Sequence, residues 1–341
     1  GCKGCKRDCP SGVDMAKLKA EVVHERHERE GASLRDRLFA NVNLLSRVGS
    51  ALAPVSNLAL RLPGSGFLGE KLLGIAAERD LPEFHRTTLR DWFESRGGPA
   101  VAEADAERVA VLVPDTYTNY NHPDAGKAAV RVLEAAGVRV ELADVEDTGR
   151  PAHSMGFLDT ARERTADAVA DLAPRVAAGR DVVVVEPSEA VMLQSDLLDL
   201  HDSEEANSVA ANSYGVLEYV DAFRLEEGMD LDGSGSLTYH GHCHQKATKK
   251  DHHAVGVLRR AGYAVDPLDS TCCGMAGSFG YEAEHHSMSE AIASILFNQV
   301  DDSPGEAVTA PGASCRSQLA ERDDADGDPP HPVEKVAEAL R

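Results

Sequence analysis

Hydrophobic and polar residues follow different periods in the two parts of this chain. Between residues 34 and 48 the apolar positions recur about every 3.6 residues, which predicts an amphipathic helix, with Leu34, Leu38, Val42, Leu45 and Val48 on one face. Such a stripe is expected to pack on a neighbouring element; docking to an upstream domain or to a membrane is left open. From residue 106 onward, short apolar runs such as 108–114 (RVAVLVP) and 181–187 (DVVVVEP) alternate with helical patterns. This succession of strand, helix and strand predicts parallel βαβ units, and therefore an α/β fold.

The α/β part is expected to be a duplication. Residues 129–140 (AVRVLEAAGVRV) match residues 254–265 (AVGVLRRAGYAV) at seven of twelve positions, with a constant offset of 125 residues. A repeated α/β unit would produce this match. We therefore expect a first repeat over residues 106–225 and a second over residues 226–341, preceded by a helical connector over residues 31–105.

The net charge limits the classes of partner. The chain has 35 Lys and Arg against 57 Asp and Glu, a formal charge of −22 at pH 7, and the acidic residues are spread along it. Such a surface argues against binding to nucleic acid or to an anionic membrane. No run approaches the roughly 20 apolar residues that cross a bilayer, and no signal peptide is visible. We expect a cytoplasmic protein whose membrane contact, where it occurs, is peripheral.

The cysteines favour bound metal over disulfides. Their number, seven, is odd, which argues against a closed disulfide framework. They fall into two tight groups, with none in the long stretch between Cys9 and Cys243. Scattered core cysteines rarely cluster in this way, so a reducing compartment and metal ligation are the better interpretation.

Residues 1–30 are expected to be the end of a two-cluster ferredoxin-like domain. The spacing Cys2-x2-Cys5-x3-Cys9, followed by proline, matches the last three cysteines of the C-x2-C-x2-C-x3-C-P run. We predict that Cys2 and Cys5 bind one [4Fe–4S] cluster and Cys9 another, with their other ligands upstream in a longer polypeptide. A zinc knuckle is the alternative, because C-x2-C is common to both. Asp14 is the predicted N-cap of the helix that follows.

The second cysteine group occupies matching places in the repeat. It reads Cys243-x28-Cys272-Cys273-x41-Cys315 and is expected to come from three loops at strand ends, where open α/β sheets place their sites. The first repeat carries polar residues at the corresponding positions, namely Thr118, Asp147, Thr148 and Glu189. The pattern predicts one functional site, in the second repeat. The matching positions of the first repeat have no cysteines, so no such site is expected there.

Adjacent cysteines suit a centre with several iron atoms, because neighbouring thiolates can bind different irons. Structural zinc prefers C-x2-4-C pairs around one ion. Three glycines follow the pair and allow the backbone to approach closely and aim N–H groups at cluster sulfurs, namely Gly274, Gly277 and Gly280. Arg316 is expected to offset the negative charge of the cluster. A zinc site and a metal-free redox dithiol stay open as alternatives.

Histidines surround the same cysteines. His240, His242 and His244 alternate, so on a strand their side chains would point the same way. We place His242 and His244 among the cofactor-binding residues; ligation by one of the three histidines is left open beside hydrogen bonding or substrate contact. His285 and His286 follow the glycines and are expected to cover the site.

These motifs resemble the CCG-domain family, which includes the CCG-type subunit of heterodisulfide reductase and the iron–sulfur subunits of glycolate and glycerol-3-phosphate dehydrogenases. The chain is most similar to the C-terminal half of large FAD-linked oxidases of the D-lactate and D-2-hydroxy-acid dehydrogenase type. The likeness spans nearly the whole chain. It is carried by "CKGCKRDCPSGVDMAKLKAE", "PDTYTNY", "GRPAHSMG", "HGHCHQKA", "CCGMAGSFGYEAEH", "SCRSQ" and "HPVEKVAEAL".

The resemblance implies an upstream FAD domain that oxidises a 2-hydroxy acid of the D-lactate, glycolate or 2-hydroxyglutarate type. Electrons would pass through ferredoxin-type [4Fe–4S] clusters and one CCG-type cluster to a quinone, a cytochrome or another carrier. This chain would be the electron-transfer part of that oxidoreductase. By position, Cys2, Cys5 and Cys9 correspond to ferredoxin-type ligands. The ligands of the CCG-type cluster correspond to Cys243, Cys272, Cys273 and Cys315.

The chain departs from the family in two places. Relatives often have cysteines where the first repeat has Asp147-Thr148 and Glu189, so a second CCG-type cluster is not expected. Cys315-x-x-Gln318 also replaces the C-x-x-C of heterodisulfide reductase, which weakens the case for disulfide chemistry. A thiol or disulfide reductase that uses Cys272 and Cys273 directly is the alternative function.

Overall fold

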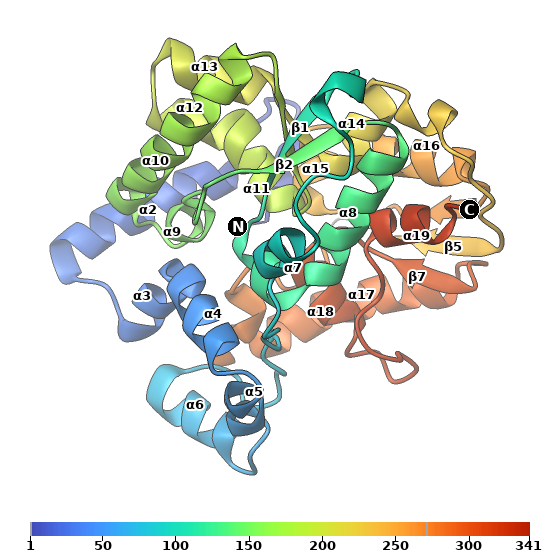
Figure 1. The fold of residues 1–341 in the computed structure, drawn as a ribbon. Coiled ribbons are helices and arrows are strands. Elements are labelled where there is room, and N and C mark those ends of the chain that lie inside the picture. The colour runs from blue at the N-terminus through green and yellow to red at the C-terminus, as the bar shows by residue number, and fades with distance from the viewer. Residues whose placement is uncertain (1, 271) are drawn as a thin grey trace.

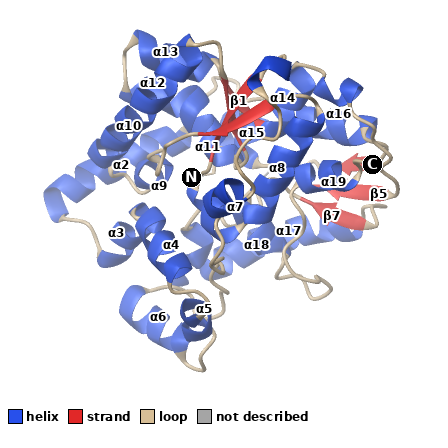
Figure 2. Ribbon diagram, viewed as in Figure 1, coloured by secondary structure: helices blue, strands red, loops and turns tan. Residues whose placement is uncertain are grey.

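Two parallel β-sheets, one in each expected repeat, form the framework of the computed structural model, which describes residues 2–270 and 272–341 (Figure 1). Figure 2 shows their strands among many helices. The strand order is β2-β1-β3-β4 in the first sheet and β6-β5-β7 in the second. Each repeat's first strand thus lies between the two that follow it, and the α/β fold class is confirmed. The strands are β1 (Val109–Val113), β2 (Arg139–Leu142), β3 (Asp181–Val184), β4 (Ser213–Gly215), β5 (Ser236–Tyr239), β6 (Ala264–Pro267) and β7 (Ala307–Thr309).

Helices precede the first sheet and cover both sheets. Those before the first strand are α1 (Gly4–Asp8), α2 (Met15–Glu30), α3 (Leu34–Ala40), α4 (Val42–Ala51), α5 (Val55–Leu60), α6 (Ser65–Leu73) and α7 (Leu89–Ser95). Those of the first half are α8 (Pro123–Ala135), α9 (Arg150–Ser154), α10 (Leu158–Ala177), α11 (Pro187–Val191), α12 (Leu197–Leu200), α13 (Glu204–Ala211) and α14 (Val216–Ala222). The second half has α15 (Cys243–Ala247), α16 (His252–Arg260), α17 (His286–Asp301), α18 (Ala313–Leu319) and α19 (Pro332–Glu338). None of the helices in the described part of the chain is both long and apolar enough to cross a bilayer.

Local sequence explains where these elements begin and end. Pro123 stands in the first turn of α8, where a missing N–H costs nothing, and Gly137 just beyond its end has φ +73°. The carboxylate of Asp14 accepts the backbone N–H groups of Ala16 and Lys17, so the predicted N-cap of α2 is confirmed. The apolar runs predicted as strands form the buried strands β1 and β3. The exact bounds of the four expected segments stay a prediction.

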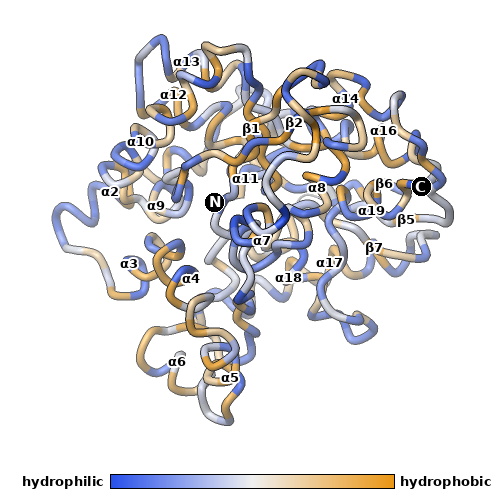
Figure 3. The backbone as a smooth tube through the Cα atoms, in the orientation of Figure 1, coloured by the Kyte–Doolittle hydropathy of each residue, from blue (hydrophilic) through white to orange (hydrophobic). Residues whose placement is uncertain are grey.

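Helix α4 in the connector turns its polar face inward. Its buried residues are Asn43, Ser46, Gly49 and Ser50, whereas Leu44, Leu45 and Val48 are exposed. Of the predicted apolar stripe, Leu38 and Val42 are half-buried, whereas Leu34, Leu45 and Val48 are exposed, so packing within the described chain accounts for only part of it. The tube in Figure 3 places hydrophobic residues of α4, α5 and α6 on a lobe at the edge of the molecule.

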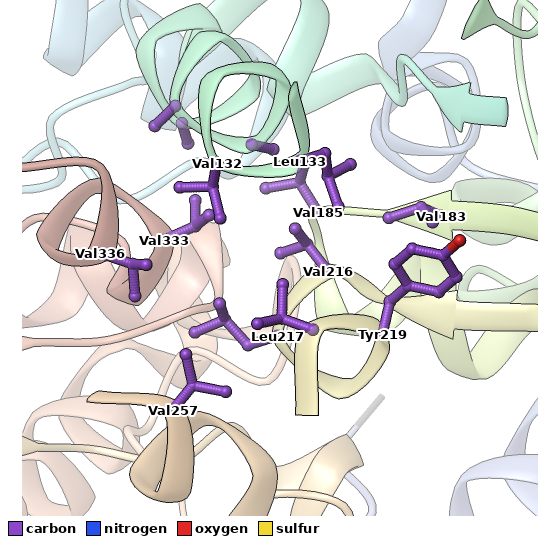
Figure 4. Close-up of a cluster of buried hydrophobic side chains, with 14 of the residues drawn as sticks. Val132, Leu133, Val183, Val185, Val216, Leu217, Tyr219, Val257, Val333 and Val336 are labelled. Atoms are coloured by element: carbon purple, nitrogen blue, oxygen red, sulfur yellow. The ribbon is translucent and has the colours of Figure 1, made fainter. Parts of the chain in front are cut away.

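One hydrophobic core joins the two sheets (Figure 4). The first half supplies side chains from α8, β3 and α14, and the second half supplies side chains from α16 and α19. Helix α19 packs against both α8 and α16, so the end of the chain closes on the first half. Burial of this shared apolar surface holds the two sheets as one body.

A buried ion-pair network fixes the N-terminal residues to the first half. Lys3 is almost fully buried, and its Nζ lies 2.7 Å from Asp14 and 3.2 Å from Asp196. The other carboxylate oxygen of Asp196 lies 2.7 Å from Nη1 of Arg150. Burial alone raises the pKa of Asp196, but Arg150 and Lys3 together hold it below its usual range.

The Asp196→Asn variant should lower the free energy of unfolding by roughly 3–5 kcal/mol, because it leaves Lys3 and Arg150 without their shared buried anion. Urea unfolding of the wild type and the variant at neutral pH measures the difference. The stabilisation by Asp196 should be present above the unfolded pKa of about 4 and be lost as the pH falls through the lower folded value.

Asp199→Asn is the matched control, because that carboxylate is 52% exposed and, among the described residues, pairs with Lys17 alone. It should change the free energy of unfolding by less than about 1 kcal/mol. Equal effects of the two substitutions would contradict the role assigned to the buried network.

Candidate metal centre

The four cysteines of the second group lie at one edge of the second sheet. Cys243 begins α15, which follows β5, and Cys315 lies on α18, which follows β7. Cys272 and Cys273 come after β6. All three strands are parallel, so their carboxyl ends meet at the same edge, where open α/β sheets bind ligands.

The thiols at this edge form a continuous set that includes a member of the N-terminal group. Cys273 shares side-chain hydrogen bonds with Cys272 and Cys315. Cys2 shares side-chain hydrogen bonds with Cys243 and Cys272. Five sulfurs contributed by four separate parts of the chain therefore lie together, and Cys273 and Cys315 are buried.

Backbone N–H groups point at four of these sulfurs. The amides of Gly274 and Gly4 lie 3.3 Å from the sulfurs of Cys272 and Cys2. The amides of Lys3 and Met275 donate to the sulfurs of Cys243 and Cys273. Donors of this kind stabilise thiolates and raise the reduction potential of a metal centre that they surround.

The contacts among these thiols and their burial raise the pKa of four of them, whereas the hydrogen bonds with Cys243 and Cys272 lower the pKa of Cys2. The hydrogen bond to Cys2, together with burial, raises the pKa of Cys243. Hydrogen bonds to Cys2 and Cys273, with burial, raise the pKa of Cys272. A bound metal ion reverses this effect, because its positive charge deprotonates the thiols that coordinate it. The donor set thus suits a metal centre better than it suits a reactive thiolate.

The three N-terminal cysteines do not converge on one point. Cys2 joins the set just described, whereas Cys5 is exposed on α1. Cys9 accepts hydrogen bonds from the backbone amides of Val13 and Ser11, which lower its pKa. The assignment of these cysteines to two ferredoxin-type clusters stays a prediction, and the contact of Cys2 with the second group was not foreseen.

The three alternating histidines occupy different environments, because β5 already ends at Tyr239. One ring nitrogen of His240 and the sulfurs of Cys273 and Cys315 all lie within 4.8 Å of one another. Nδ1 of His242 accepts the backbone N–H of His244 at 3.2 Å and caps α15. The three histidines therefore do not lie on a strand, so the condition for a shared direction is not met, and His240 is the histidine that groups with the sulfurs of Cys273 and Cys315.

The glycines after the cysteine pair have distinct structural tasks. A Cβ on Gly274 would lie 2.4 Å from the carbonyl oxygen of Ser289, and one on Gly280 would lie 2.5 Å from Sδ of Met275. Gly277 has φ +77°, a conformation that favours glycine. Gly274 and Gly280 thus permit close packing, and the amide of Gly274 also reaches a sulfur. A cofactor-binding role for Gly277 and Gly280 stays a prediction.

Two buried cations brace the loops that carry the cysteines. Nζ of Lys246 donates to the carbonyl of Leu268 at 3.0 Å and to that of Ser270, just before the cysteine pair. Nε of Arg79 donates to the carbonyl of Gly280 at 2.9 Å, and its Nη2 lies 3.2 Å from Oε1 of Gln318. The sequence did not single out Lys246 or Arg79, because both act through contacts with residues distant in the chain.

Arg316 follows Cys315 on α18 and pairs with α19. Its Nη1 is 3.7 Å from a carboxylate oxygen of Glu334, and its Nε has no partner among residues 2–270 and 272–341. The positive charge of Arg316, together with burial, lowers the pKa of His122 and His331. Its expected effect on a cluster stays a prediction. His285 stacks on Phe279, with ring centroids 4.1 Å apart, at the far end of the glycine loop.

Oxygen-bearing side chains stand at the corresponding place in the first half. Thr148 donates a hydrogen bond to Glu189, as Cys273 pairs with Cys315 in the second half. Glu186, three residues earlier, accepts the backbone N–H of Ala313 at 2.9 Å, at the start of the helix that carries Cys315. Burial and the neighbouring Asp115 raise the pKa of Glu186 to about 7.

Comparison with known proteins places the second cysteine group within one named domain. The model of the cysteine-rich domain called CCG matches residues 237–320. The chain is similar to a subunit of the anaerobic glycerol-3-phosphate dehydrogenase of Escherichia coli (strain K12), with 27% identity over 342 residues that cover 97% of this chain and 83% of that protein.

Two further relatives have other names. D-2-hydroxyglutarate dehydrogenase of Escherichia coli (strain K12) is 26% identical over 355 residues, which cover this whole chain but only 34% of that protein. Lactate utilization protein A of Geobacillus kaustophilus is 30% identical over 182 residues, which cover 50% of this chain and 72% of that protein. The chain therefore spans about a third of the length of D-2-hydroxyglutarate dehydrogenase. It spans most of the length of the glycerol-3-phosphate dehydrogenase subunit and of lactate utilization protein A.

The Gly274→Ala variant should disrupt the cysteine loop, because the new Cβ meets the Ser289 carbonyl in a backbone conformation with φ +98°. The clash should add about 1–3 kcal/mol to the backbone cost. Gly327→Ala is the matched control, because φ there is +88° and nothing lies within 4 Å of the new Cβ.

Thermal and urea unfolding of both variants measure this difference, and the control should lose only about 1 kcal/mol. If Gly327→Ala destabilises the protein as much as Gly274→Ala does, close packing at Gly274 is not the reason for its glycine.

Proposed function

Because this chain belongs to the family of proteins with the cysteine-rich CCG domain, we propose that it is the electron-transfer module of an FAD-linked oxidoreductase. One observation carries the proposal. Buried and half-buried cysteines that follow three strands meet at the carboxyl edge of one parallel sheet, with backbone N–H groups directed at their sulfurs. Bound there, an iron–sulfur cluster would supply one-electron transfer.

The proposed ligands are Cys243, Cys272, Cys273 and Cys315. Adjacent thiolates at Cys272 and Cys273 suit different irons of one cluster better than one tetrahedral ion. The loops that carry them are fixed by buried cations and by close glycine packing, so the chain holds the thiols in place before a metal binds. The amides directed at the sulfurs would raise the reduction potential, which favours acceptance of an electron from a flavin.

The oxidised substrate is proposed to be a 2-hydroxy acid or a related small alcohol. D-2-hydroxyglutarate dehydrogenase and lactate utilization protein A bear such compounds in their names, and glycerol-3-phosphate is the corresponding compound for a third relative. Oxidation would take place on FAD in an upstream domain or partner subunit. The electrons would leave for a quinone, a cytochrome or another carrier.

The N-terminal segment is proposed to bring a second centre close to the first. Cys2 would be a ligand on the ferredoxin-like side, and it touches Cys243 and Cys272. Lys3, the next residue, is fixed by Asp14 and Asp196 and also donates its backbone N–H to Cys243. A ferredoxin-type cluster that used Cys2 would therefore stand directly beside the CCG-type site, which shortens the path for electrons.

A thiol or disulfide reductase is the rival function. It would need Cys272 or Cys273 as a thiolate nucleophile at neutral pH. The raised pKa of Cys272 opposes this, because hydrogen bonds to Cys2 and Cys273 and burial all favour its protonated form.

We also propose that the protein touches a membrane only at the surface, through the exposed apolar residues of the connector.

Protein purified without oxygen should contain a cluster of about four irons with matching sulfide at this site. The Cys272→Ser/Cys273→Ser double variant should lose that iron and its EPR signal after reduction. Iron, sulfide and zinc analyses, together with EPR of the reduced sample, measure both.

Cys5→Ser is the control, because Cys5 is exposed and lies outside the thiol set; it should keep the signal of this centre. A folded protein with free thiols and little iron would refute the electron-transfer proposal and would favour the reductase that uses Cys272 and Cys273 directly. One zinc per chain in place of iron would also refute it.

A further inference from the structure

We propose that His240 is a nitrogen ligand of the metal centre, in addition to the cysteines. The inference rests on the proposed iron–sulfur site and specifies its ligand set. A ring nitrogen of His240 lies within 4.8 Å of the sulfurs of both Cys273 and Cys315. All three residues are buried, and they follow three different strands, His240 after β5, Cys273 after β6 and Cys315 after β7.

The two ring nitrogens of His240 are in different situations. Nδ1 lies 2.6 Å from Oγ of Ser270, which is itself 3.3 Å from Nζ of Lys246. Nε2 is buried and has no hydrogen-bond partner among residues 2–270 and 272–341. A buried nitrogen without a partner is unfavourable, and coordination to a metal would satisfy it.

This arrangement matches the way proteins present histidine to metals. A metal-bound histidine usually engages its second ring nitrogen with an oxygen atom, which fixes the orientation of the ring. Ser270 supplies that oxygen, and Lys246 fixes the Ser270 backbone by donating to its carbonyl.

His242 does not have this freedom. Its Nδ1 accepts a backbone N–H and caps α15. Its ring also packs closely on Gly312, since a Cβ at that glycine would lie 2.3 Å from Cδ2 of His242. His242 therefore serves the local backbone. The sequence pattern left open which of the three histidines coordinates a metal, and the geometry favours His240.

The test is hyperfine spectroscopy of the reduced centre in protein labelled with [15N]histidine. A directly coordinated nitrogen should give a strong 15N coupling in the wild type. His240→Ala should lose that coupling and shift the EPR spectrum, whereas His240→Cys should lose the coupling but keep the iron. His242→Asn is the matched control, because asparagine can still cap α15, and it should leave the coupling unchanged.

The outcomes separate this inference from the proposed function. A wild-type protein without iron refutes the proposed function. An iron-loaded wild type without strong histidine 15N coupling refutes only the role of His240, and that measurement needs no variant to fold. A coupling that persists in His240→Ala would assign the ligand to another histidine and overturn the inference.

We also infer, from a separate observation, that connector residues 34–73 dock on an anionic lipid surface. This specifies the surface for the peripheral membrane contact proposed above and does not depend on the metal centre. Among the described residues, these forty hold twelve of the twenty exposed large apolar side chains. They are Leu34, Leu44, Leu45, Val48, Leu52, Val55, Leu58, Leu60, Leu62, Phe67, Leu68 and Leu72.

Hydrogen bonds hold this apolar face outward. On the inner side of α4, Nδ2 of Asn43 donates to Oγ1 of Thr116 at 3.0 Å. On α5, Asn57 exchanges two hydrogen bonds of 2.9 Å with the backbone of Phe84. Because the polar sides of both helices are engaged inside, their apolar sides cannot turn in without losing these bonds.

The charge of the connector favours a lipid surface over other occupants. Residues 34–73 contain five basic and two acidic residues, in a chain whose total charge is −22. Arg35, Arg47 and Arg61 pair with glutamates outside this range, which leaves Arg37 and Lys71 as its basic residues without an ion pair in the described part of the chain. Short helices that combine exposed Leu and Phe with Arg and Lys are typical of segments that lie in the membrane interface. The acidic remainder of the molecule would be repelled by the same lipids, so it would orient the connector toward them.

Co-sedimentation with vesicles tests this surface. The purified protein should bind phosphatidylglycerol vesicles at least tenfold more tightly than phosphatidylcholine vesicles, and salt should weaken the binding. The Val48→Ser/Leu58→Ser/Phe67→Ser variant should lose at least tenfold in binding. Met288→Ser/Ile295→Ser is the matched control, because these side chains are similarly exposed, at 57% and 61%, but lie outside the connector.

Two results would overturn the inference. The first is no binding of the wild type to anionic vesicles, or an equal loss of binding in the control variant. The second is that the connector variant binds vesicles normally but no longer co-purifies with its flavin-bearing part, which would assign the face to a protein interface. Neither result bears on the iron content of the protein.

Discussion

The contact between Lys3 and the buried carboxylate of Asp196 decides how the rest of the site is assembled. The two residues are 193 positions apart, and both are shielded from water. A buried charge is tolerated only when it is compensated, and Asp196 has three cations, Lys3, Lys17 and Arg150, in contact with it. Because Cys2 precedes Lys3, this ion pair sets the position of Cys2 beside the thiols of the second half. The N-terminal segment is therefore part of the same body as the two sheets.

The first half supports the site of the second, although it lacks cysteines. At the place where the second half pairs Cys273 with Cys315, the first half pairs Thr148 with Glu189. Glu186 extends this oxygen-bearing region across the boundary and accepts an N–H at the start of α18. One copy of the duplicated unit thus supplies the thiols, and the other supplies a buried polar wall against which the cysteine-bearing helix is fixed.

Patterns within one segment could be read from the sequence, whereas contacts between segments could not. Strands β1 and β3, the cap at Asp14 and the edge of the sheet where the cysteines meet follow from local periodicity and strand order. The alternation of three histidines gave no means of choosing among them, because the choice depends on where β5 ends and on the partner that Ser270 offers to His240. The approach of Cys2 depends on ion pairs that no local pattern encodes.

Helix α4 illustrates a further reason why periodicity alone misplaces an element. An amphipathic pattern identifies two faces, but it does not say which face turns inward. In α4 the inner face is polar, because Asn43 finds hydrogen-bond acceptors at Thr116 and at the carbonyl of Glu146, 3.0 and 2.6 Å away. The net charge of the chain is likewise an average over all residues, and it does not describe residues 34–73, which hold five basic and two acidic residues. An apolar, basic face on an otherwise acidic molecule can meet an anionic surface in only one orientation. The connector would therefore determine which side of the electron-transfer module faces the membrane.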